Sequence, residues 1–107
     1  MKKMITSILI ASGITSSVYA GCAGNACLNV DVEKIVVTTS TIFIATSGTE
    51  TALSCTPSAG VFTTLSATEA SSKAMYSALL TAQTTKRKVK IRIVNGSPTC
   101  KISYVEL

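Results

Sequence analysis

The sequence contains no histidine and no tryptophan, and only five of its 107 residues are aspartate or glutamate. Without histidine the chain cannot build a Ser-His-Asp triad, a Cys-His pair or a histidine-ligated zinc site. Five carboxylates also make a carboxylate cage for a metal ion an unpromising arrangement. We therefore expect no catalytic residues, no metal site and no cofactor.

Charged residues are scarce as well, at 14% of the chain, whereas 47% of the residues are hydrophobic. Disordered proteins have the opposite balance, with low hydrophobicity and high net charge. A length of 107 residues allows one domain, because domains usually span about 100–200 residues. We expect a single folded domain.

The first twenty residues have the pattern of a secretory signal peptide. Met1-Lys2-Lys3 is basic, residues 4–18 carry no charge, and Val18-Tyr19-Ala20 ends in the small-x-small manner of a cleavage site. A membrane span is the alternative, but glycine, serine and threonine dilute the apolar run. We expect cleavage after Ala20, and hence a secreted or periplasmic domain of residues 21–107 with no transmembrane span.

Two further properties depend on this cleavage. Tyr19-Ala20-Gly21-Cys22 resembles a lipobox, so a lipoprotein with a lipidated Cys22 is the second possibility. Loss of Lys2 and Lys3 leaves eight cations against five carboxylates, a net charge of +3. Nucleic-acid-binding domains are usually much more basic, and we expect no nucleic-acid partner.

Four cysteines in a small exported domain are typical of two disulfides. Three pairings are possible among Cys22, Cys27, Cys55 and Cys100. Cys22 and Cys27 are close enough in sequence to close a small loop, and Cys55 and Cys100 would then join the middle of the chain to its last strand. A redox or metal site is the alternative, but the chain has no C-x-x-C motif and no histidine. We expect the disulfides Cys22–Cys27 and Cys55–Cys100.

Hydrophobic periodicity predicts three strands, one helix and two strands. The first strand changes its apolar phase near Glu33-Lys34, where we expect a bulge that bends it. The predicted strands cover residues 28–37, 42–45, 52–55, 86–94 and 99–107, and a capping box at Ser66–Glu69 precedes a helix over about 70–83. This order is typical of a small five-stranded OB-fold-like Greek-key barrel, mainly β with one helix. A generic α+β sandwich would give a similar order.

The strand over residues 86–94 is the sharpest candidate surface. Strict alternation places Lys88, Lys90 and Arg92 on one face and Val89, Ile91 and Ile93 on the other. The cations would attract an anionic glycan, anionic lipid or acidic partner subunit. Alternatively, they protect an edge strand from pairing with another chain.

Two weaker candidates accompany the basic strand. The hydroxyl-rich segments Thr38–Thr41 and Thr46–Thr49 are able to hydrogen-bond sugar hydroxyls from exposed loops, although such residues also form ordinary strands and turns. Tyr104 offers an aromatic ring for stacking, but its strand pattern places it on the same face as Ile102, which favours a core or interface role.

Two segments of the chain resemble a known family. They are Phe43-Ile44 with the glycine-containing turn and Leu53-Ser54-Cys55 after it, and Met75–Ala82 followed by Val89-Lys90-Ile91-Arg92-Ile93. With them, residues 42–94 resemble the B subunits of bacterial AB5 toxins, in particular the subtilase-cytotoxin and pertussis-like group. The resemblance implies an OB-fold, a homo-oligomeric ring of five subunits, a host-glycan ligand and an enzymatic A subunit as partner. No sugar-contacting residue is carried over from the family.

The sequence therefore favours an exported, non-catalytic binding module, similar to the glycan- and receptor-binding B subunit of a toxin. The alternative is a small periplasmic or surface accessory or inhibitor protein that acts by protein–protein contact. An OB-fold for single-stranded nucleic acid would need aromatic platforms along a basic groove, and only 5% of the residues are aromatic.

Overall fold

The computed structural model describes residues 20–107. The expected signal peptide, apart from Ala20, lies outside these residues. The elements in chain order are β1 (Gly21–Ala23), β2 (Ala26–Val30), β3 (Val32–Val37), β4 (Thr41–Thr46), the 3-10 helix η3 (Glu50–Ala52), β5 (Thr63–Ser66), α1 (Ala70–Thr85), β6 (Val89–Ile93) and β7 (Ile102–Glu106).

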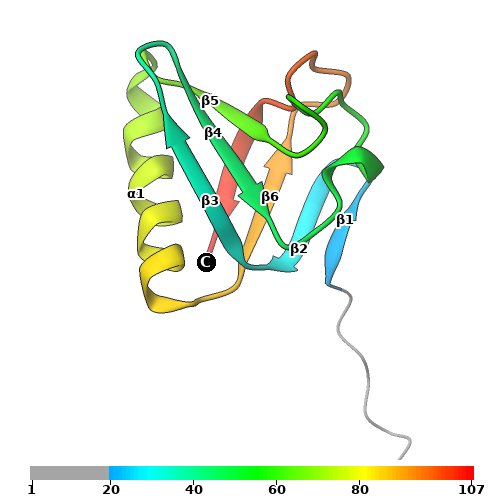
Figure 1. The fold of residues 1–107 in the computed structure, drawn as a ribbon, viewed down its shortest axis with the longest axis horizontal. Helices are drawn as coiled ribbons and strands as arrows, with labels where there is room; N and C mark the ends of the chain where they lie inside the picture. The colour runs from blue at the N-terminus through cyan, green and yellow to red at the C-terminus, as the bar shows by residue number, and fades with distance from the viewer. Residues whose placement is uncertain (1–19) are drawn as a thin grey trace, which may run out of the picture.

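The strands form two antiparallel sheets, so the protein is mainly β with one helix, as expected (Figure 1). One sheet has the strand order β1-β2-β6-β7 and the other the order β3-β4-β5. A parallel bridge between Thr64 of β5 and Lys101 connects the two sheets, and over residues 20–107 they do not close into a complete barrel. Helix α1 packs against β3, β5 and β7.

The bend expected in the first strand is present. The strand breaks at Asp31, so that β2 belongs to one sheet and β3 to the other. Val32 pairs with Thr46 and Lys34 with Ala45, which leaves Glu33 as an extra residue. The bulge predicted near Glu33-Lys34 is therefore confirmed, and it absorbs the change in apolar phase.

The third strand lies elsewhere than predicted. Residues 50–52 form η3, and Leu53 makes only an isolated bridge with Gly24. The Glu50 carboxylate, which is 3% exposed, accepts hydrogen bonds from the backbone N–H and the hydroxyl of Thr46 at 2.8 and 2.7 Å. These bonds fix residues 50–52 as a turn against the end of β4. The third strand of this sheet is instead β5, at Thr63–Ser66.

The helix forms where its periodicity predicts, over Ala70–Thr85. The predicted capping box is wrong, because Glu69 is the N-cap residue and no side chain caps the helix. The Ser66 hydroxyl instead lies 3.1 Å from that of Thr68. Leu79 and Ala82 are buried, so this stripe packs against the sheets.

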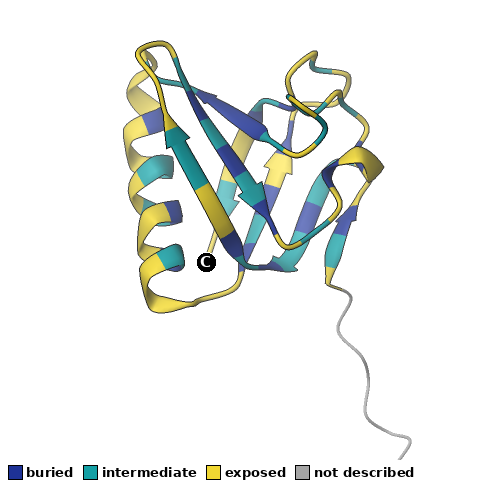
Figure 2. Ribbon diagram, in the orientation of Figure 1, coloured by how far each residue is buried: buried dark blue, intermediate teal, exposed yellow. Residues whose placement is uncertain are grey.

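The core lies between the two sheets and the helix (Figure 2). Its largest fully buried side chains are Ile44, Leu65, Leu79, Ile91 and Ile102. The Cys22–Cys27 disulfide joins β1 to β2, and the Cys55–Cys100 disulfide joins the segment after η3 to the segment just before β7. Both are the pairs favoured by the sequence, and two disulfides indicate an oxidising extracellular or periplasmic environment.

Candidate binding face

Strand β6 has the two faces that its alternation predicts. Val89, Ile91 and Ile93 are buried, whereas Lys90 and Arg92 point away from the core. However, β6 lies between β2 and β7 rather than at an edge. The interpretation that its cations protect an edge strand is therefore wrong, and their clustering needs another explanation.

Tyr104 lies beside these two cations. Arg92 pairs with Tyr104 and Ile93 pairs with Ile102, so Ser103 is an extra residue in β7. The Ser103 hydroxyl donates to the Arg92 carbonyl oxygen at 3.2 Å. Because of this bulge, Ile102 faces the core while Tyr104 is 38% exposed on the outer face. The expectation that Ile102 and Tyr104 share a face is wrong.

Lys90, Arg92 and Tyr104 together form what we call the tyrosine–cation face. The Lys90 ammonium and the Arg92 guanidinium carbon lie 5.7 and 5.9 Å from the centre of the Tyr104 ring. Hydrogen bonding from Arg92, and next from Lys90, lowers the pKa of the Tyr104 hydroxyl below its ordinary value. The face thus combines an exposed aromatic ring with two positive charges, a combination that attracts anions and offers a stacking surface.

Lys88 and Lys90 each form an ion pair with a carboxylate of the protein. Lys88, the third predicted cation, forms an ion pair with Asp31 at 2.9 Å, next to the break between β2 and β3. Lys90 lies 3.9 Å from a carboxylate oxygen of Glu106, a longer and weaker pair. Lys90 is therefore paired more weakly than Lys88, and Arg92 forms no ion pair within residues 20–107.

A hollow of about 320 Å³ adjoins the tyrosine–cation face. It is lined by Leu28, Asn29, Lys88, Val89, Lys90, Glu106 and Leu107. Its apolar floor and charged rim suit a ligand that carries both an apolar group and an anionic group.

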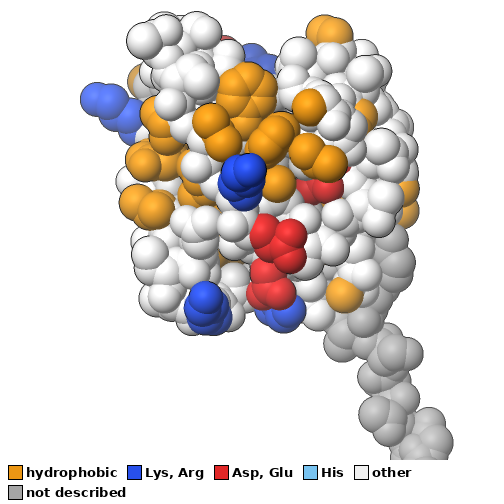
Figure 3. All heavy atoms as spheres, viewed as in Figure 1, with side chains coloured by type: hydrophobic (Ala, Val, Ile, Leu, Met, Phe, Trp, Pro, Cys, Tyr) orange, Lys and Arg blue, Asp and Glu red, His pale blue; other side chains and the backbone are white. Residues whose placement is uncertain are grey.

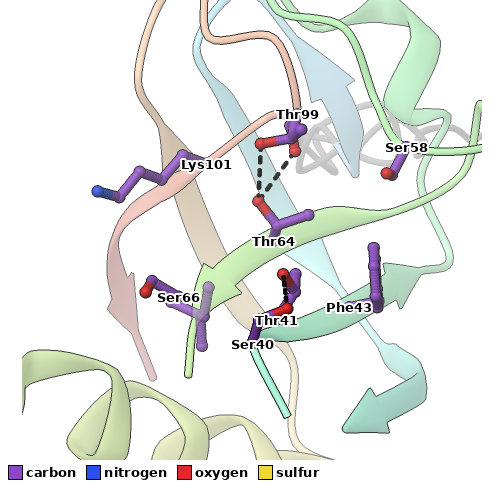
Figure 4. Close-up of a pocket in the computed structure, with 9 residues that line it drawn as sticks. Ser40, Thr41, Phe43, Ser58, Thr64, Ser66, Thr99 and Lys101 are labelled. Carbon is purple, nitrogen blue, oxygen red and sulfur yellow. Dashed lines mark hydrogen bonds between the residues drawn. The ribbon is translucent and has the colours of Figure 1, made fainter. Parts of the chain in front are cut away.

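A second hollow, of about 300 Å³, lies where β4 and β5 meet the segment before β7 (Figure 4). We call it the hydroxyl hollow, and it is lined by Ser40, Thr41, Phe43, Ser58, Thr64, Leu65, Ser66, Thr99 and Lys101. Only the end of the predicted Thr38–Thr41 segment reaches it. In the other predicted segment, Thr46 is buried against Glu50, and the Ser47 hydroxyl accepts a hydrogen bond from the Asp31 N–H.

The outer face of the β3-β4-β5 sheet is largely apolar. Val36 pairs with Phe43, and both alternate with residues that face the core. Figure 3 views this side of the molecule and shows apolar side chains gathered around one cation. Val37, which is 57% exposed at the end of β3, pairs with the core residue Ile42 and so lies on the other side of the sheet.

Residues 20–107 contain no group of three or more potential metal ligands from histidine, cysteine, aspartate and glutamate. Their one α-helix does not have the length and hydrophobicity needed to cross a membrane.

Comparison of the chain with models of protein families, with curated protein sequences and with solved structures gives no match.

Proposed function

We propose that this protein is an exported, non-catalytic binding module that recognises an anionic host glycan through the tyrosine–cation face. The observation that carries the proposal is the exposed Tyr104 ring with two cations less than 6 Å from its centre. A carboxylate or sulfate of the ligand would bind Lys90 and Arg92, while a sugar ring would stack on Tyr104.

The position of the two cations supports a role in binding. They lie on a central strand, so they serve no purpose in protecting an edge. The 3.9 Å separation between Lys90 and Glu106 leaves room for a ligand anion to replace this weak partner. Exposed ion pairs of this kind, here between the ligand anion and the two cations, contribute about 0.5–1 kcal/mol each, so two of them would change affinity by about five- to thirtyfold.

We further propose that the two sheets correspond to the halves of an OB-fold barrel. β2 and β3 act as one bent strand shared between the sheets, the helix precedes the last two strands, and the parallel bridge between Thr64 and Lys101 lies on the opposite side of the barrel. These features are compatible with the partly open five-stranded barrel. The five-membered ring and the enzymatic A subunit remain expectations from the resemblance to toxin B subunits.

A protein-contact role is the second candidate. It is supported by the apolar outer face of β3-β4-β5, because contiguous exposed apolar surface often marks a protein interface. In this case the molecule would act as an accessory or inhibitor protein, and a partner rather than a glycan would be retained on an affinity column.

A glycan array followed by affinity measurements separates these functions. The test variant is K90Q/R92Q, and the matched control is K73Q/R87Q, which removes the same two charges from exposed positions outside the face. We expect anionic glycans on the array, a five- to thirtyfold loss of affinity for the best of them in K90Q/R92Q, and little loss in the control.

Salt dependence provides a second readout. Exposed charges are screened over about 8 Å at physiological ionic strength, so the wild type should lose affinity as salt rises while K90Q/R92Q changes less. An array with no anionic ligand, or equal losses in the test and control variants, would refute the proposed site. Thermal melts establish that both variants are folded.

A further inference from the structure

We propose that the hydroxyl hollow is a second binding site, which takes one neutral pyranose ring. It is separate from the tyrosine–cation face, and it differs from that face in the chemistry of its lining. The hydroxyl groups come from segments far apart in the chain: the β3–β4 turn, β5, the loop at Ser58 and the residues before β7.

The lining presents hydroxyl groups, which both donate and accept hydrogen bonds, as sugar hydroxyls do. The Thr64 hydroxyl donates to the Thr99 carbonyl oxygen at 3.1 Å and lies 3.2 Å from the Thr99 hydroxyl (Figure 4). The Ser58 hydroxyl has no hydrogen-bond partner within residues 20–107, so a ligand can bind it without displacing a protein group.

Phe43 supplies the apolar side of the hollow. Its ring meets that of Phe62 edge to face, with 5.6 Å between centres and 64° between planes. Such contacts fix the orientation of an aromatic ring. The negative face of the ring attracts the C–H groups that a pyranose presents on one side, while its hydroxyl groups remain free to bind serine and threonine.

The charge of the hollow favours a neutral ligand. Lys101 is the one charged residue in its lining, and its ammonium group lies 2.9 Å from the Glu69 carboxylate. An anion bound to Lys101 would have to compete with this carboxylate. A neutral sugar leaves the ion pair in place and needs only hydrogen bonds and stacking.

The hollow is preformed, because a hydrogen bond and a disulfide connect the residues of its floor to the segment before β7. The Thr64 N–H donates to the Cys100 carbonyl oxygen at 3.0 Å, and Cys100 is joined to Cys55. Thr64 and Leu65 are 4% and 1% exposed. The volume of about 300 Å³ is at the lower end of the range for small-molecule sites, so the hollow has room for a single ring.

The test uses two-dimensional amide NMR of the ¹⁵N-labelled protein with a panel of neutral methyl pyranosides, namely the glucoside, galactoside, mannoside and fucoside. We expect at least one to shift the amide signals of Thr64, Thr99 and Lys101 in a saturable way. Ser58→Ala removes a free hydroxyl group and should weaken binding about fivefold, the equivalent of one hydrogen bond. Ser71→Ala, at an exposed helix position, should leave binding unchanged.

Phe43→Leu keeps an apolar side chain but removes the ring, and it should weaken binding more than Ser58→Ala does. The proposal is overturned if no neutral pyranoside shifts these signals, if the shifts map to the tyrosine–cation face, or if Ser58→Ala and Ser71→Ala bind alike. Because anionic ligands of the tyrosine–cation face would shift Lys90, Arg92 and Tyr104 instead, the two proposals can fail independently.

Discussion

Removal of the Cys55–Cys100 disulfide should destabilise the protein more than removal of the Cys22–Cys27 disulfide. The first bridge closes a sequence separation of 45 residues and the second a separation of 5. In the chain-entropy model these loops correspond to about 4 and about 2 kcal/mol of the free energy of unfolding. We therefore expect the C55A/C100A variant to lose about 2 kcal/mol more than C22A/C27A.

Burial of the cysteines predicts the opposite order of stability loss for the two variants. The measured order therefore distinguishes loop closure from packing as the cause. Cys22 and Cys27 are 4% and 0% exposed, whereas in the longer bridge Cys100 is 0% exposed and Cys55 is only partly buried. If lost packing governed the effect, C22A/C27A would lose at least as much stability as C55A/C100A. Cys100 has a φ of 48°, in the left-handed region. Alanine and cysteine both carry a Cβ and are equally strained there, so Cys100→Ala does not change the backbone strain.

Urea unfolding of the exported protein measures both losses. The slope of the free energy against urea concentration should be compared as well, since a changed slope reports a changed denatured or native state. Reduction of the C22A/C27A variant with dithiothreitol is the control, because it opens the longer loop without removing any sulfur atom. Equal losses in the two variants, or a larger loss in C22A/C27A, would refute the loop-closure argument.

Three further predictions are open to direct measurement. The intact mass of the exported protein should correspond to residues 21–107 less four hydrogens, and a diacylglyceryl mass on Cys22 would contradict the expected cleavage. In a spectrophotometric titration, Arg92→Gln should move the ionisation of Tyr104 to higher pH, because hydrogen bonding from Arg92 is the largest cause of its lowered pKa. An unchanged titration curve would show that Arg92 does not lower this pKa. Gly48→Ala should cost about 1–3 kcal/mol of stability, since a Cβ would lie 2.6 Å from the Cys22 sulfur and 3.2 Å from the Cys22 nitrogen. Urea unfolding in a Cys22→Ala background should show a smaller loss, and an equal loss would contradict the steric explanation.

Local pattern was sufficient for features that depend on neighbouring residues. The alternation of Val89, Ile91 and Ile93 gave the faces of β6, and the phase change gave the bulge at Glu33. The helical spacing of Leu79 and Ala82 gave the helix and the side that it buries. In each case the direction of the side chains repeats at a fixed interval along the strand or helix, so a short stretch of sequence is enough to predict it.

Other features depend on partners that a local pattern does not contain. Thr63 and Thr64 are buried in β5 because their hydroxyls donate to the carbonyl oxygens of Ile44 and Thr99, so a polar sequence forms an inner strand. Tyr104 faces outward only because Ser103 bulges against β6. The hydroxyl hollow escaped prediction for the same reason, since its residues meet only after both sheets have formed.

The bulges in the edge strands β3 and β7 also bear on how the molecule avoids aggregation. Within residues 20–107 the sheet orders place β1, β3, β5 and β7 at edges, where unpaired backbone groups invite a further strand. β1 has three residues, β5 is bridged to Lys101, and β3 and β7 each carry an extra residue that breaks a regular edge, at Glu33 and at Ser103. Deletion of either extra residue would leave a flatter edge and should make fibre formation faster, so both irregularities also oppose strand pairing between neighbouring copies.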